Sequence, residues 1–123
     1  MQQNYAEAVK WYRLAAEQGY AKAQVNLGSM YGEGNGVPQD NAAALKWYCL
    51  AAEQGEPKAY ACLGFMYGLG DGLAKDYVYA HKCLSWALAK PLDPVDRELA
   101  TKALEIFVSE MTPDQLIEAH RES

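Results

Sequence analysis

Apolar and polar positions alternate along the chain with the period of amphipathic helices. In residues 42–54, Trp47 and Leu50 are spaced to line the packing side of one helix. Asp40 is suited to cap the start of this helix, and Gly55 is suited to a left-handed residue at its end. The pattern therefore predicts one helix between Asp40 and Gly55.

A second pattern follows directly after this glycine. Ala59, Leu63 and Met66 lie four and three residues apart, which places them on one stripe of a helix. Glycine-containing segments separate the helical patterns, and their lengths suit connections between helices. We predict antiparallel helix pairs and no strands.

The pattern repeats. Residues 4–39 and 40–75 are identical at 20 of 36 aligned positions without a gap. A degenerate third copy occupies residues 76–91, where Cys83 and Leu84 replace the Trp-Tyr pair of the first two copies. A period of this length is typical of helical repeat proteins, in which each unit stacks on its neighbours.

Residues 92–123 depart from the repeat and are predicted to form capping helices. Asp93 and Pro94 favour a helix start, with the helix continuing to about Glu110. Thr112 and Gln115 have the spacing of a capping box at the start of a second helix. The side chains expected to cover the open end of the last repeat are Leu99, Ala103, Ile106 and Phe107.

Within the repeats, two motifs, A-x3-LG-x-MY-x-G-x-G and AxKWYxLAAEQG, resemble the Sel-1-like repeat (SLR), a relative of the tetratricopeptide repeat. The matching residues are Leu27, Gly28, Tyr31, Gly32, Gly34, Gly36, Trp47, Tyr48, Ala51 to Gly55, Leu63, Gly64, Tyr67, Gly68, Gly70 and Gly72. The resemblance implies an all-α, right-handed α/α solenoid of antiparallel helix pairs and a bacterial source. It also implies a non-catalytic adaptor that binds proteins. We expect residues 1–123 to form a single SLR solenoid that is a fragment of a longer array.

Net charge restricts the partners. The formal net charge is −5, and residues 91–123 hold three basic and eight acidic side chains, whereas residues 1–90 hold eight of each. A chain without a basic surface lacks the electrostatic driving force for binding nucleic acid. No apolar run reaches the length of a membrane span. With nucleic acid and a direct membrane span excluded, we expect a protein or peptide partner.

Candidate chemistry is sparse. The glycine clusters lack the spacing of phosphate-binding loops, and Cys49, Cys62, Cys83, His81 and His120 lack the spacing of zinc ligands. We therefore expect no catalytic, metal or cofactor site and no enzymatic activity. Two alternatives stay open: a hydrolase or binder of cell-wall or antibiotic-like ligands, as attributed to disulfide-rich relatives, or a structural spacer within a longer protein.

Three unclustered cysteines favour reduced thiols, so cytoplasm is the default compartment. A periplasmic or secreted location follows instead if an upstream signal peptide was removed.

The positions that differ between copies indicate a partner-binding surface. By resemblance to similar solenoids, the shorter helix of each pair lines the concave side, where we expect a peptide or protein segment to bind. The candidate residues form one stripe in each copy: Lys22, Asn26, Ser29 and Glu33, then Lys58, Cys62, Phe65 and Leu69. The alternative for Phe65 and Leu69 is packing on the following helix.

Two further expectations concern packing. Helical spacing and repetition favour core positions for the aromatic residues, so the predicted buried set is Trp11, Leu27, Tyr31, Trp47, Leu63 and Tyr67, and Tyr12, Tyr48 and Trp86 are also placed in the core rather than in a ligand cage. The chain opens inside a linker, so the first helix lacks a preceding partner. We expect end-to-end self-association at this N-terminal face.

Overall fold

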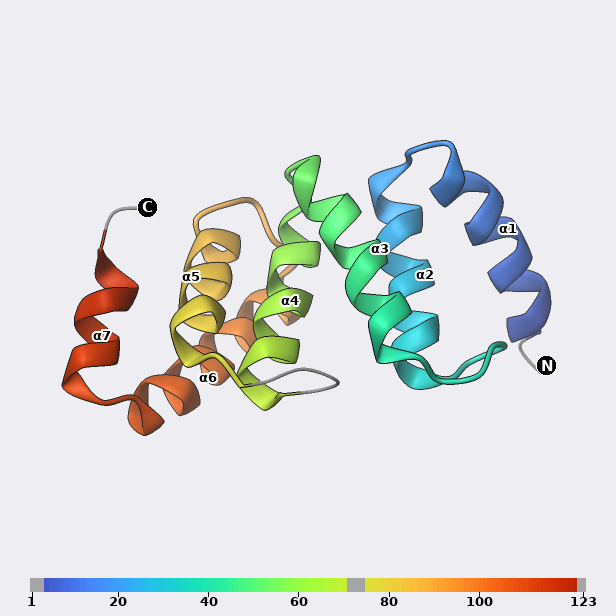
Figure 1. Ribbon diagram of the computed structural model, residues 1–123. Coiled ribbons are helices and arrows are strands. Elements are labelled where there is room, and N and C mark those ends of the chain that lie inside the picture. The colour runs from blue at the N-terminus through green and yellow to red at the C-terminus, as the bar shows by residue number, and fades with distance from the viewer. Residues whose placement is uncertain (1–3, 71–74, 122–123) are drawn as a thin grey trace. The chain divides into compact units, whose positions relative to one another are not determined.

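The structure, a computed structural model, describes residues 4–70 and 75–121 and contains only helices in that part (Figure 1). Seven helices are present there, which confirms the predicted all-α fold. They are α1 (Tyr5–Glu17), α2 (Ala21–Glu33), α3 (Asn41–Glu53), α4 (Pro57–Leu69), α5 (Tyr77–Leu88), α6 (Pro94–Glu110) and α7 (Pro113–His120).

The chain divides into two compact units, one ending at Ala59 and the other beginning at Tyr60. In the first unit, α2 packs against both α1 and α3. In the second unit, α5 packs against both α6 and α7. Each unit has its own apolar core, described below.

The start of each repeat is set by the same local interaction. Asn4, Asp40 and Asp76 lie 36 residues apart, and each side chain accepts a hydrogen bond from the backbone N–H three residues later. These bonds measure 3.0, 3.1 and 2.9 Å. Such caps satisfy backbone donors that a helix start leaves unpaired. The helix start therefore survives in the third copy although much of its sequence has changed.

The C-terminal helices begin as predicted. The Asp93 carboxylate accepts a hydrogen bond from the backbone N–H of Val95 at 2.8 Å, with Pro94 in the first turn. The capping box is complete: the N–H of Gln115 donates to the Thr112 hydroxyl, and the Thr112 N–H donates to the Gln115 side chain.

Glycine allows the closest helix contacts in both units. A Cβ at Gly28 of α2 would lie 2.8 Å from the Tyr48 ring of α3. At the equivalent position of the next copy, a Cβ at Gly64 would lie 2.7 Å from Leu84 of α5. Real side chains do not approach this closely, so the glycine of the LG motif makes room for the large side chain that follows the Trp position.

The core of the second unit is closed by α6. Ala80 and Leu84 of α5 form a buried cluster with Ala100 and Phe107 of α6. The Phe107 ring occupies the space over Gly68, where a Cβ would lie only 2.1 Å from it. Phe107 and Ala103 thus cover the last repeat as predicted.

The other two predicted covering residues are exposed. Leu99 and Ile106 are 52% and 61% exposed, so the prediction is wrong for them. The buried side of α6 is centred on Ala100 and Phe107, and a residue one position earlier is rotated by about 100° around the helix.

The buried set is confirmed only in part. Leu27 and Leu63 are fully buried, whereas Trp11 is 60% exposed and the prediction is wrong there. Trp11 lies on the side of α1 opposite to Val9 and Ala16, which face α2. The remaining three of the set, Tyr31, Trp47 and Tyr67, are half-buried.

The core assignment also fails for Trp86, although it holds for Tyr48. Tyr48 is buried, whereas Trp86 is exposed and stacks on Tyr60 with ring centroids 4.0 Å apart. The ammonium of Lys90 lies over the Trp86 ring at 4.5 Å from its centroid.

Candidate functional site

One side of α2 lines two hollows on the first unit. Asn26, Ser29 and Glu33 line a hollow of about 360 Å³ shared with α1. Lys22 and Asn26 line a second hollow of about 150 Å³, together with Val25, Glu56 and Lys58. The structure therefore brings five of the eight predicted binding residues to adjoining hollows, and Asn26 belongs to both.

The larger hollow has a mixed lining suited to peptide recognition. We call it the α1–α2 groove and define it by Asn4, Tyr5, Ala8, Tyr12, Asn26, Ser29, Met30, Glu33 and Asn35. Three asparagine amides, two tyrosines and a methionine converge on one space. Amides can donate to and accept from a peptide backbone, and the rings and thioether offer apolar contact.

Several contacts fix the walls of this groove. The Arg13 guanidinium donates to the Tyr31 hydroxyl at 2.6 Å and ties α1 to α2. Ser29 Oγ and Tyr48 Oη are hydrogen-bonded at 3.0 Å, which ties α2 to α3. Gly36 has a left-handed φ of 79°, and a Cβ there would lie 2.5 Å from the Tyr5 carbonyl oxygen. The loop after α2 can therefore lie directly against the start of α1.

The polar groups of the groove differ in how far they are already engaged. Asn35 Nδ2 donates to Glu33 Oε1 at 2.8 Å, and the Asn4 Oδ1 caps α1. The half-buried Asn26 amide makes no hydrogen bond to the described residues 4–70 and 75–121. Its donor and acceptor are thus available to a ligand.

The two ends of α2 carry side chains of opposite charge. Lys22 stands at the start of the helix beside Lys58 and Glu56, a set with one net positive charge. Glu33 stands at the other end, eleven residues later or about 16 Å along the axis. A segment lying along this side of α2 meets a positive end and a negative end.

The three remaining predicted residues belong to the second unit. Phe65 is partly buried and packs against the cluster formed by Ala80, Leu84 and Phe107. Leu69 is 57% exposed, and Cys62 is half-buried. Phe65 therefore has a packing role, and a binding role for these three residues stays a prediction.

Comparison with known proteins accounts for the repeated helix pairs. The family model described as Sel1 repeat matches residues 1–20, 21–56 and 57–88. The chain belongs to the Sel1 repeat family. The family units begin at Ala21 and Pro57, so α2 and α3 form one Sel1 repeat and α4 and α5 form the next. The α1–α2 groove thus lies where one repeat meets the next. The helices α2 and α4 are not the shorter members of their pairs as predicted, because α2, α3 and α4 each have 13 residues and α5 has 12.

Two solved Sel1-type structures are similar over most of the chain. One is c5321, a protective antigen present in uropathogenic Escherichia coli strains displaying an SLR fold, with 33% identity and a TM-score of 0.85 over 97% of this chain. The other is a Sel1 repeat protein from Oxalobacter formigenes, with 40% identity and a TM-score of 0.66 over 72% of this chain. The chain spans only 25% and 37% of these two proteins. The search of curated proteins found no match.

Sel1 repeats generally serve as scaffolds for protein interactions and are typically non-catalytic. Their solenoid of helix pairs is the fold predicted here from the sequence. Across residues 4–70 and 75–121, no helix is long and apolar enough to cross a membrane.

The thiol of Cys49 in this Sel1 array is held away from its reactive form. Burial, and then the charge of Glu53, raise the pKa of the Cys49 thiol, which disfavours the nucleophilic thiolate. None of the three cysteines forms a disulfide. In the part of the chain that the structure describes, no three His, Cys, Asp or Glu side chains gather as metal ligands would.

Sequence reasoning missed the α1 wall of the groove. Asn4, Ala8 and Tyr12 recur every four residues and so share one side of α1. This spacing was a usable signal, because a binding stripe on α2 needs a second wall from the helix beside it. The glycines also proved structural: Gly34 and Gly36 are left-handed loop residues. Gly72 of the second cluster lies outside the described residues.

Proposed function

We propose that this Sel1 repeat array is a non-catalytic scaffold that holds an extended peptide segment of a partner protein in the α1–α2 groove. The observation that carries the proposal is the Asn26 amide, which lines both hollows and is not hydrogen-bonded within the described residues. The Asn26 amide is only half-buried, so it can exchange hydrogen bonds to water for hydrogen bonds to a peptide backbone.

The α1–α2 groove and the adjoining hollow at Lys22 together favour one polarity for the segment. The positive set at Lys22 and Lys58 favours a carboxylate, either a side chain or a chain terminus. Glu33 at the other end favours a lysine or arginine. Peptides with an acidic and a basic end about 16 Å apart fit this arrangement.

A peptide-display selection tests the proposal. Randomised peptides are selected on the wild-type protein and then measured for affinity by fluorescence anisotropy. Asn26→Ala should raise the Kd of selected peptides about tenfold, the effect of about 1.4 kcal/mol of lost hydrogen bonding. Asn41→Ala, a half-buried asparagine at the start of α3, is the matched control and should leave the Kd unchanged.

Charge reversal tests the polarity. Lys22→Glu should select peptides with a basic residue where the wild type selects an acidic one. Selected peptides that bind wild type and Asn26→Ala equally would show that the α1–α2 groove is not the binding site.

A further inference from the structure

A second candidate surface lies on α6, in the second unit. Val95, Leu99 and Ile106 are 66%, 52% and 61% exposed. Their spacings of four and seven residues put them on one stripe of the helix, turned away from the buried Ala100 and Phe107. We call these three residues the α6 stripe. It spans eleven residues, or roughly 16 Å, which is about three helical turns.

Carboxylates border the α6 stripe on both sides. Glu98 and Glu105 lie along one edge and Glu110 along the other, and all three are exposed. The segment from residue 91 to the end of the chain has three basic and eight acidic side chains, so the surroundings share this sign. An apolar stripe between acidic edges is therefore the chemical character of this surface.

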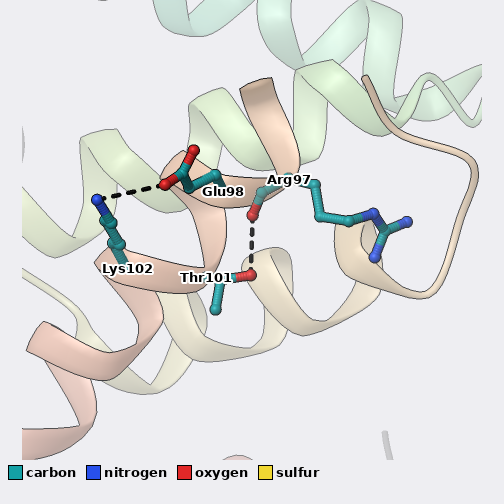
Figure 2. A network of polar contacts seen from close by, with 4 residues as sticks. All are labelled: Arg97, Glu98, Thr101 and Lys102. Carbon is teal, nitrogen blue, oxygen red and sulfur yellow. Dashed lines mark hydrogen bonds and ion pairs between the residues drawn. The ribbon is translucent and has the colours of Figure 1, made fainter. Parts of the chain in front are cut away.

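Of the two basic side chains of α6, the exposed Lys102 lies on the α6 stripe itself, three residues after Leu99 and four before Ile106. Lys102 forms an ion pair with Glu98 at 3.4 Å, and both side chains are about two-thirds exposed. Figure 2 shows this pair on one side of α6, with the Arg97 side chain pointing away from it. The Arg97 guanidinium donates to the carbonyl oxygens of Leu88 and Lys90 at 3.0 and 2.8 Å. Arg97 thus braces the loop before α6, and Lys102 pairs with Glu98, so Glu105 and Glu110 carry the acidic character of the edges.

We propose that the α6 stripe docks an amphipathic helix of a partner protein whose apolar seam is bordered by lysine and arginine. Val95, Leu99 and Ile106 stand at positions i, i+4 and i+11, so they lie on the same side of the helix over about three turns, as the anchors of a helix laid along another do. The charge decides the class of occupant, because acidic edges attract a basic helix and repel an acidic one or an anionic membrane. The α6 stripe shares no residue with the α1–α2 groove, so an experiment that refutes one proposal leaves the other standing.

Designed peptides of about 18 residues test this proposal. One carries leucines along one side with lysines on both edges, and its twin carries glutamates in place of the lysines. The lysine peptide should bind the wild-type protein in isothermal titration calorimetry, and the glutamate peptide should not. Leu99→Ser or Ile106→Ser should weaken binding of the lysine peptide about tenfold or more, as for a central interface anchor.

The controls separate docking from folding and from general stickiness. Ile117→Ser on α7 removes an apolar side chain as exposed as Ile106, at 62%, and should leave binding unchanged. Circular dichroism melts of all variants should match the wild type, because the substituted side chains are exposed. Glu98→Lys combined with Glu105→Lys should reverse the preference between the two peptides.

Any of four results would overturn the proposal. Equal affinity for both peptides would remove the charge argument, and binding unaffected by Leu99→Ser and Ile106→Ser would place the peptide elsewhere. Concentration-dependent dimerisation lost in Ile106→Ser, or binding of the wild type to phosphatidylcholine vesicles lost in the same variant, would assign the stripe to a second copy or a membrane.

Discussion

Gly68→Ala is the substitution for which the structure and helix propensity predict opposite effects. Alanine favours a helix over glycine by about 1 kcal/mol, so propensity alone predicts stabilisation. The added Cβ, however, would lie 2.1 and 2.2 Å from Cζ and Cε2 of Phe107. Carbon atoms in contact are normally about 3.5 to 4 Å apart. The Phe107 ring or the whole of α6 must therefore move by more than an ångström.

The magnitude follows from how well Phe107 is packed. The ring is 5% exposed and belongs to the buried cluster of the second unit. Forcing extra atoms into a packed core costs about 1 to 3 kcal/mol. After the gain in helix propensity of about 1 kcal/mol, we expect a net loss of up to about 2 kcal/mol in the free energy of unfolding. That corresponds to a decrease in Tm of up to about 8 °C for a chain of this size.

The chain contains its own matched control. Gly32 occupies the position equivalent to Gly68 in the preceding copy, but a Cβ there would meet only the Ala44 Cβ at 3.8 Å. Gly32→Ala should therefore raise the Tm by about 4 °C through propensity alone. The same substitution at two equivalent positions should shift the Tm in opposite directions.

Thermal melts followed by circular dichroism, with urea titrations for the free energy, measure both variants. A double-mutant cycle with Phe107→Ala isolates the clash, because Gly68→Ala should become neutral or stabilising once the ring is gone. The reasoning is refuted if Gly68→Ala melts at or above the wild type. An unchanged loss in the Phe107→Ala background would refute it equally.

Three other predictions concern burial, pH and self-association. Leu63→Ala should lower the free energy of unfolding by about 2 to 5 kcal/mol, because it opens a cavity in the core. Leu69 is exposed, so Leu69→Ala should melt within a few degrees of the wild type. Similar losses of stability in the two variants would contradict the assigned burial. His81 is buried with its ring 5.0 Å from that of His120, and burial first, then the His120 charge, lower the His81 pKa. The unfolded chain therefore binds a proton at His81 more readily than the folded chain does, so the Tm should decrease as the pH is lowered from about 7.5 to about 5. The decrease should be smaller in His81→Gln, and an equal decrease in both proteins would exclude this linkage. Exposed Trp11 should promote concentration-dependent association in sedimentation velocity, with Trp11→Glu shifting the protein to monomer; association unchanged in that variant would place the contact elsewhere.

The sequence by itself determined the features that depend on neighbouring residues along the chain. The helix starts at Asp40 and Asp76 were readable because a capping carboxylate bonds to a backbone group three residues away. The capping box at Thr112 and Gln115 was readable for the same reason. The Sel1 family itself was evident, because the repeat is a pattern of such local signals at a fixed period.

The residues that line the two hollows of the first unit were predicted in part. Asn26 and Glu33 were found because their positions vary between copies while the packing positions do not. Their partners Tyr5 and Tyr12 were not found, because which side of α1 meets α2 is a property of helix packing and of no single segment.

Tertiary structure decided what becomes of equivalent positions. Trp11 and Trp47 are the same residue in the same motif, yet Trp11 is exposed and Trp47 is half-buried against the first core cluster. Gly32 and Gly68 likewise share a motif position, but only Gly68 is covered by the ring of Phe107. A repeated sequence gives each copy the same helix, while burial depends on neighbours that differ from copy to copy. For that reason the period predicted the elements, and only the packed structure showed which of their side chains form the core.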